Sequence, residues 1–174
     1  ALDKSVAALE DTDALIIDAR GPQGGTMTSV SYLDSYFLSG DTPVHLSSSI
    51  ARNPGTETFR TDELYSVDTP FSYDKPVYIL TSKRTLSAGE FFAYNLQALK
   101  RATLVGETTS GAANAAGMAP LGPGLAMMLS GARTENAITR TNWEGVGVKP
   151  DVAATNDEAL KVALERLGRA PSAS

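Results

Sequence analysis

Short, continuous apolar runs alternate along the chain with segments in which apolar residues recur at helical spacing. Continuous runs of this kind are typical of buried parallel strands. The predicted strands span residues 14–18, 77–81 and 103–105. The predicted helices span residues 2–10, 26–37, 87–99 and 157–167, and Thr26 is the expected N-cap of the second. Strands that alternate with helices predict an α/β layered fold.

Two stretches of the chain depart from this alternation. Residues 44–74 are rich in Ser, Thr, Asn, Pro and Gly, which predicts loops, with a hairpin as an alternative. Residues 108–124 are small and glycine-rich, which predicts a loop. Residues 125–129 and 137–141 are predicted as two further strands, with pairing between them as one option.

Composition narrows the function classes. The net charge of −5, from 20 acidic and 15 basic residues, argues against a nucleic-acid partner, which requires a basic face. The chain has no cysteine, which excludes disulfides and thiolate sites, and His45 alone cannot form a zinc site that needs two histidines. No apolar stretch is long enough to span a membrane. Residues 1–174 are interpreted as one domain that lacks its N-terminal part, because the chain opens inside a predicted helix.

Ser87 is the strongest candidate for chemistry. It lies in TSKRTLSAGE (residues 81–90), where a predicted buried strand is followed by a polar loop and a helix. A serine at a helix N-terminus sits where free N–H groups and the helix dipole favour developing negative charge, which suits a nucleophile. The alternative is an N-cap whose capping box is completed by Glu90, and local sequence alone favours this cap.

Other candidates are weaker by themselves. Gly24 and Gly25 follow a strand end, where two backbone N–H groups can form an oxyanion hole, although a plain strand-to-helix turn explains them equally. His45 is the sole imidazole and thus a possible general base, but its alternating surroundings favour a strand residue near the surface. Glu144 lies in a turn beside Trp143, either to orient a base or as a solvated acid, and local sequence leaves both open.

Taken together, three segments resemble the tail-specific (C-terminal-processing) serine peptidases. They are ALIIDARGPQGG, the long run YILTSKRTLSAGEFFAYNLQALKRATLVGETTSG, and WEGVGVKPDV, in that order. The FAYNL helix and the WEG turn resemble the branch of interphotoreceptor retinoid-binding protein and its bacterial peptidase relatives. The resemblance implies a Clp-protease/crotonase-like ββα spiral, with Ser87 as nucleophile and oxyanion donors on the backbone around Gly24, Gly25 and Ala88. It also implies that no metal or cofactor is needed.

The sequence departs from the family pattern where a base is expected. Serine–lysine members carry lysine at the position of Ala112, and relatives in the retinoid-binding branch often carry histidine at the position of Asn114. Neither alanine nor asparagine accepts a proton at neutral pH. Another branch uses a Ser-His-Ser-Glu tetrad with its histidine upstream of this region, and Glu144 is the tetrad acid by that analogy.

These observations leave two main functions open. The first is a serine endopeptidase that cuts unstructured protein tails in the periplasm or another extracytoplasmic compartment, as the resemblance implies. The second is a weak or inactive relative that binds an apolar small molecule, retinoid- or fatty-acid-like, or a peptide in the same cleft. Five residues are candidates to line such a pocket, although core packing explains them as readily: Phe91, Phe92, Met118, Met127 and Met128. A further option is an incomplete domain that depends on upstream segments.

Overall fold

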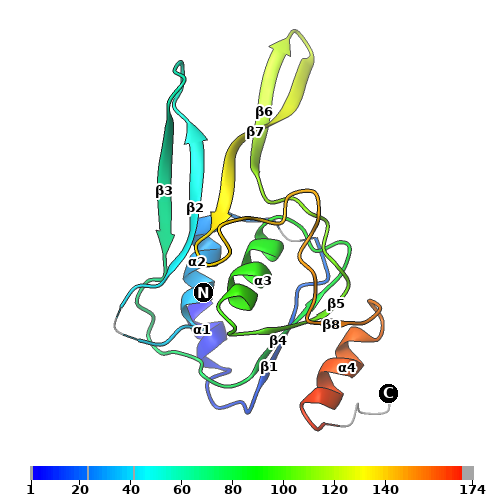
Figure 1. Cartoon of the computed structure of the whole chain (residues 1–174). Coiled ribbons are helices and arrows are strands. Elements are labelled where there is room, and N and C mark those ends of the chain that lie inside the picture. Colours follow the sequence, from blue (N-terminus) through cyan, green and yellow to red (C-terminus); the bar gives the residue numbers. More distant parts are fainter. Residues whose placement is uncertain (1, 23, 41, 170–174) are drawn as a thin grey trace.

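The computed structural model describes residues 2–22, 24–40 and 42–169, which form two four-stranded sheets and four helices (Figure 1). The helices are α1 (Leu2–Ala7), α2 (Met27–Ser35), α3 (Ala88–Ala98) and α4 (Ala159–Arg166). The strands are β1 (Leu15–Asp18), β2 (His45–Arg52), β3 (Phe59–Tyr65), β4 (Val77–Thr81), β5 (Thr103–Gly106), β6 (Ala115–Gly122), β7 (Leu125–Asn136) and β8 (Val152–Ala153). None of the described helices is long and apolar enough to cross a membrane.

The first sheet is parallel, with strand order β1-β4-β5-β8. The three apolar runs predicted as buried strands form β1, β4 and β5. The side chains of neighbouring residues in these strands lie on opposite faces of the sheet. Ile79 packs into the main core with α3, whereas Leu80 packs with α4. Helices therefore cover both faces of the sheet, which explains why its strands are apolar without alternation.

The second sheet is antiparallel, with order β3-β2-β7-β6, and two of its hairpins project from the body as separate arms (Figure 1). The hairpin alternative for residues 44–74 is confirmed by β2 and β3. The loop predicted for residues 108–124 is wrong over its second half, because Ala115–Gly122 forms β6 and pairs with β7. The missed signal is the Pro123–Gly124 turn, which lies between two apolar runs of similar length.

The strand predicted at residues 137–141 is also wrong. These residues form a turn after β7, and residues 125–129 pair with β6 instead. The cause is Asn136, whose side-chain Oδ1 accepts hydrogen bonds from the backbone N–H groups of Ile138 and Thr139, both at 3.0 Å. An asparagine that bonds its following backbone in this way closes a turn and ends the strand.

A buried polar cluster joins the second sheet to the two central helices. Asn95 on α3 donates to Oδ2 of Asp34 on α2 at 2.9 Å, and its Oδ1 accepts from Ser47 on β2 and Asn136 on β7. All four side chains are buried. Oδ1 of Asp34 has no hydrogen-bond partner in the described structure, and burial raises the pKa of this carboxyl well above its usual range.

Replacing Asp34 with asparagine is therefore expected to stabilise the protein at neutral pH by about 1–3 kcal/mol, because the variant buries this side chain without taking up a proton. In the native protein the raised pKa makes the folded state hold a proton that the unfolded state releases. The contribution of Asp34 to the free energy of unfolding is greatest below the pKa that its carboxyl has in the unfolded state. The contribution falls as the pH rises from that value to the pKa of the carboxyl in the folded state. Urea unfolding across this pH range should show a decline that Asp34→Asn removes and the exposed control Asp62→Asn retains. A decline that is equal in all three proteins would contradict the assignment.

Candidate active site

Ser87 occupies a strained turn between β4 and α3. Its backbone angles are φ 53° and ψ −111°, in a region that side chains other than glycine rarely adopt. Such strain persists only where the surroundings enforce it, and it is concentrated at functional sites. The backbone N–H of Ser87 donates to Glu90 at 2.9 Å, so the carboxylate half of the predicted capping box is present. Ser87 is itself exposed and therefore accessible.

Ser87 lines a pocket of about 550 Å³ at the N-terminus of α3. The pocket brings together segments that are far apart in the sequence, and most of its side chains are apolar. It is lined by Gly25, Thr26, Met27, Leu86, Ser87, Ala88, Phe91, Ala112, Ala113, Asn114, Ala115, Ala116, Met128 and Trp143. The indole N–H of Trp143 is buried and has no hydrogen-bond partner among the described residues. Sequence reasoning missed Trp143 as a lining residue, because its position in a turn gives no sign of burial.

Three of the four predicted oxyanion and substrate residues lie in this pocket, namely Gly25, Ala88 and Asn114, whereas Gly24 does not line it. A Cβ atom on Gly25 would lie 3.3 Å from the Cβ of Ala88, so the glycine turn approaches the start of α3 closely. Ala88 is the first residue of α3, and the first amides of a helix have no acceptor within the helix. The arrangement therefore brings the backbone of the glycine turn and the first turn of α3 close to Ser87.

Glu90 fastens the turn of Ser87 to the loop that follows β5. Its carboxylate is fully buried, yet it accepts hydrogen bonds from the backbone N–H groups of Gly111 and Ala112 at 2.7 and 2.9 Å, and from the hydroxyl of Thr109. With the bond from Ser87, one side chain holds both walls of the pocket. The sequence indicated only the capping bond, because the loop partners are distant along the chain.

Glu144 holds the next part of the same loop. Its exposed carboxylate accepts from the backbone N–H groups of Ala113 and Asn114, both at 2.8 Å. The amide of Asn142 supports this turn by accepting from the N–H of Glu144 and donating to Oδ1 of Asn114. Glu144 is not among the residues that line the pocket, and its contacts are those of a residue that positions the loop.

None of the fourteen lining residues is Lys, His, Asp or Glu. His45 lies on β2, where its ring stacks on Tyr65 with a centroid separation of 4.9 Å and bonds the hydroxyl of Ser48, which agrees with the strand interpretation. The residues described here contain no cluster of His, Cys, Asp and Glu that could hold a metal. The pocket thus combines an accessible serine with an uncharged lining.

Five aromatic and methionine residues were predicted to line a pocket, and the structure places them in three different environments. Phe91 and Met128 line the pocket beside Ser87. Phe92 is buried in the core, where its ring packs against that of Phe37 at 5.9 Å. Met118 and Met127 lie on the arm formed by β6 and β7 and are 64% and 48% exposed, so the expectation that they line a pocket is wrong.

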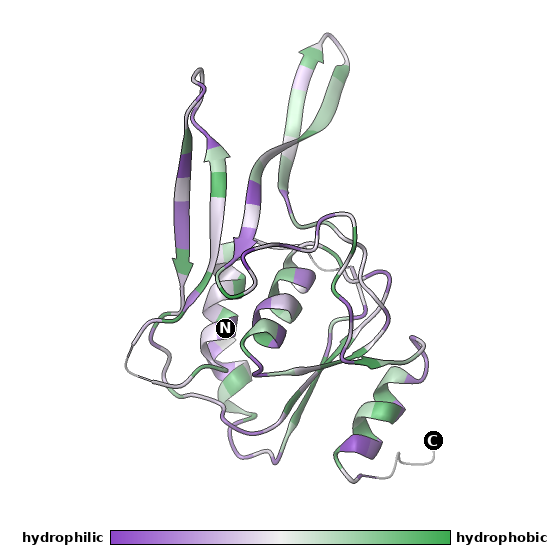
Figure 2. Ribbon diagram, viewed as in Figure 1, coloured by the Kyte–Doolittle hydropathy of each residue, from purple (hydrophilic) through white to green (hydrophobic). Residues whose placement is uncertain are grey.

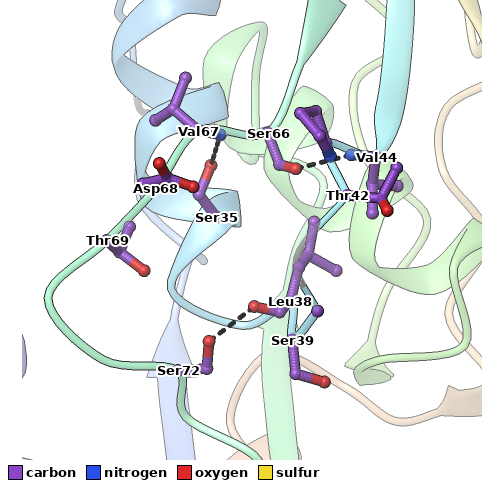
Figure 3. A pocket seen from close by; sticks show the side chains of 12 residues that line it. Ser35, Leu38, Ser39, Thr42, Val44, Ser66, Val67, Asp68, Thr69 and Ser72 are labelled. Atoms are coloured by element: carbon purple, nitrogen blue, oxygen red, sulfur yellow. Dashed lines mark hydrogen bonds between the residues drawn. The ribbon is translucent and has the colours of Figure 1, made fainter.

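A second cavity of about 300 Å³ lies between the C-terminal end of α2 and the segments that flank β2 and β3 (Figure 3). Four of its polar side chains, those of Ser35, Ser66, Thr69 and Ser72, are engaged in local hydrogen bonds. The hydroxyl of Ser35 accepts from the N–H of Val67, and the hydroxyl of Ser66 accepts from the N–H of Val44 (Figure 3). Because these bonds close the surrounding loops, the cavity is explained by loop structure and the Ser87 pocket is the better candidate site.

Several solved structures are similar to this chain. The chain is similar to a putative peptidase from Parabacteroides merdae (22% identity, TM-score 0.78), with 95% of this chain and 55% of that chain covered. It is also similar to a photosystem II D1 C-terminal processing protease (21% identity, TM-score 0.72), with 90% and 39% covered, and to mature CPAF (17%, TM-score 0.73), with 90% and 42% covered. The chain thus spans less than two thirds of the length of these proteins.

These structures share the fold of the chain, and the tricorn protease is a further similar structure (TM-score 0.51). The mixed parallel and antiparallel sheets are those of the Clp-protease/crotonase-like type, which confirms the predicted fold class. The sequence itself matches the description "Peptidase family S41" over residues 1–154. The predicted relationship to tail-specific serine peptidases is therefore confirmed, and the chain belongs to peptidase family S41.

Proposed function

We propose that this protein is a serine-type peptidase that acts through an acyl-enzyme at Ser87. The observation that carries the proposal is the strained turn that exposes Ser87 at the N-terminus of α3, inside a pocket shared with Gly25 and Ala88. In a polypeptide held there, Oγ of Ser87 attacks a carbonyl carbon and gives its proton to a base. The resulting oxyanion accepts hydrogen bonds from backbone N–H groups around Gly25 and Ala88.

The rest of the reaction follows the general course of acyl transfer. The base returns the proton to the leaving amine as the C–N bond breaks, which leaves an ester on Ser87. Water then attacks this ester and releases the new carboxylate. The base comes from outside the residues that line the pocket, because none of them accepts a proton at neutral pH. Glu144 contributes by holding Ala113 and Asn114 in place.

The proposed substrate is an unstructured polypeptide. One similar structure is called a C-terminal processing protease, and the apolar lining formed by Met27, Leu86, Phe91 and Met128 suits uncharged side chains. The extracytoplasmic location stays a prediction, as does the finer relationship to the retinoid-binding branch.

The test is labelling of the protein with a serine-directed fluorophosphonate. The native protein is expected to be labelled, and Ser87→Ala is expected to lose essentially all of the label, because an activated serine is the nucleophile for this reagent. Ser130→Ala, which changes an exposed serine on β7, is the matched control and should be labelled like the native protein. Equal labelling of native protein and Ser87→Ala would contradict the proposal.

A second function is favoured by the uncharged lining of the pocket. A serine without a base is a poor nucleophile, whereas a largely apolar pocket can hold a peptide or an apolar small molecule. Saturable uptake of such a ligand, by a folded protein that the fluorophosphonate does not label, would favour this binding function over peptidase activity.

A further inference from the structure

The arm formed by β6 and β7 is unusual in its chemistry. Residues 108–132 contain no charged residue, yet the large side chains of the arm are exposed to solvent. Five of them are more than half exposed: Met118, Leu121, Leu125, Met128 and Leu129. Figure 2 shows the outer part of this arm in apolar and neutral tones, whereas β3 in the other arm carries strongly hydrophilic residues. Contiguous exposed apolar surface of this kind marks a site of interaction.

The arm also presents an open strand edge, because β6 is the outermost strand of its sheet. Pro120 lies within β6 and has no N–H group. An edge strand tolerates proline where its nitrogen faces away from the neighbouring strand, so the nitrogen of Pro120 faces outward. In an antiparallel strand the backbone groups of alternate residues face the same side. The register is continuous from Ala116 to Pro120, so the N–H and C=O groups of Ala116 and Met118 face outward as well.

Pro120 limits where another strand can pair. Because it offers no donor, the outward donors of β6 are confined to Ala116 and Met118, in the half of the strand nearest the body. This half is continuous with the candidate active site, since Ala115 and Ala116 line the pocket of Ser87. Met128, which lies directly opposite Met118 in the register, lines the same pocket.

We propose that β6 receives an extended, uncharged polypeptide segment as an additional strand, which leads the bound chain to Ser87; this inference rests on the proposed function. The backbone groups of Ala116 and Met118 bond the incoming chain, while Met118 and Met128 contact its alternate side chains. A ladder of backbone donors and acceptors selects a polypeptide over a lipid. The absence of charge along residues 108–132 selects apolar and uncharged side chains.

Binding of a short fluorescent peptide of Ala, Val and Leu, followed by anisotropy, tests the proposal without any need for cleavage. Met118→Asp is expected to weaken binding by about 10-fold or more, because it places a charge in the apolar contact. The matched control is Phe59→Asp on β3, the opposite edge of the same sheet. The two side chains are 64% and 66% exposed, so folding is affected equally little, and Phe59→Asp should bind like the native protein.

Methylation of the peptide backbone gives a second measurement. Methyl groups on alternate amides that face β6 should reduce binding by about 10-fold, whereas methyl groups on the other alternate amides should leave it unchanged. Equal effects of both peptides, or equal binding by Met118→Asp and the native protein, would overturn the proposal. A dimer that Met118→Asp dissociates, in the absence of peptide binding, would overturn it too and assign the edge to a second copy of the chain.

The two proposals fail separately. Peptide binding that requires β6, in a protein that the fluorophosphonate does not label, would support the docking strand and reject the peptidase. Labelling of Ser87 in a protein with no edge-dependent peptide binding would do the reverse.

Discussion

Replacing Gly106 with alanine is expected to destabilise the protein by about 4 kcal/mol or more, among the largest effects of any single substitution. Gly106 ends β5 with a φ of 138°, and it pairs with Thr81 at the end of β4. A Cβ atom at this position would lie 2.0 Å from the carbonyl oxygen of Thr81. The contact is with backbone, which no side-chain rotation relieves, so the two strands must separate where β4 leads into the turn of Ser87.

Urea unfolding measures this effect, and Gly131→Ala on β7 is the matched control. A Cβ atom on Gly131 would meet nothing within 4 Å, and its φ lies outside the positive region, so its effect should stay within about 0.5 kcal/mol. A loss below about 1 kcal/mol for Gly106→Ala would mean that β4 and β5 do not approach as closely as described.

Replacing Glu90 with alanine is expected to cost about 3–5 kcal/mol of folding free energy. The substitution leaves three backbone N–H groups without their acceptor, those of Ser87, Gly111 and Ala112, around a site where the carboxylate is fully buried. Each orphaned buried donor costs about 1–3 kcal/mol, and partial access of water reduces the sum. The walls of the pocket also lose their common anchor, so labelling of Ser87 should fall in the protein that remains folded.

Glu144→Ala, also measured by urea unfolding, separates the effect of burying the carboxylate from the effect of its hydrogen bonds. Glu144 also accepts from two backbone N–H groups, but it is exposed, so water replaces the lost carboxylate. Its loss should be about 1 kcal/mol. If both variants unfolded at the same urea concentration, the buried clamp assigned to Glu90 would be wrong.

The parallel sheet was predictable because burial on both faces makes its strands continuously apolar. Residues 14–18, 77–81 and 103–105 carry this signal without help from the rest of the chain, and they form β1, β4 and β5. The second sheet was harder to predict because its strands are exposed. In β6 almost every residue faces solvent, so the strand lacks the alternation of a half-buried strand, and its glycines suggested a loop instead.

For the candidate site, local sequence indicated the serine at the start of a helix and the glycine turn, and the resemblance to a family related them. The sequence pattern could not predict that Trp143 lines the pocket, because it comes from a segment that only the fold brings beside Ser87. The sequence also left open how Glu144 acts, and the structure shows it bonded to the backbone of Ala113 and Asn114.

The separate arms of the second sheet bear on how the chain folds. The hairpin of β6 and β7 closes a loop of few residues, whereas the pairing of β2 with β7 joins Ser47 to Asn136 across the whole of α3. Loop closure over such a distance is slow, so the hairpins form before the sheet that unites them. During that interval both edges of an uncharged, apolar hairpin are open to other chains. Self-association should therefore be most severe during refolding at high protein concentration, before β2 reaches β7.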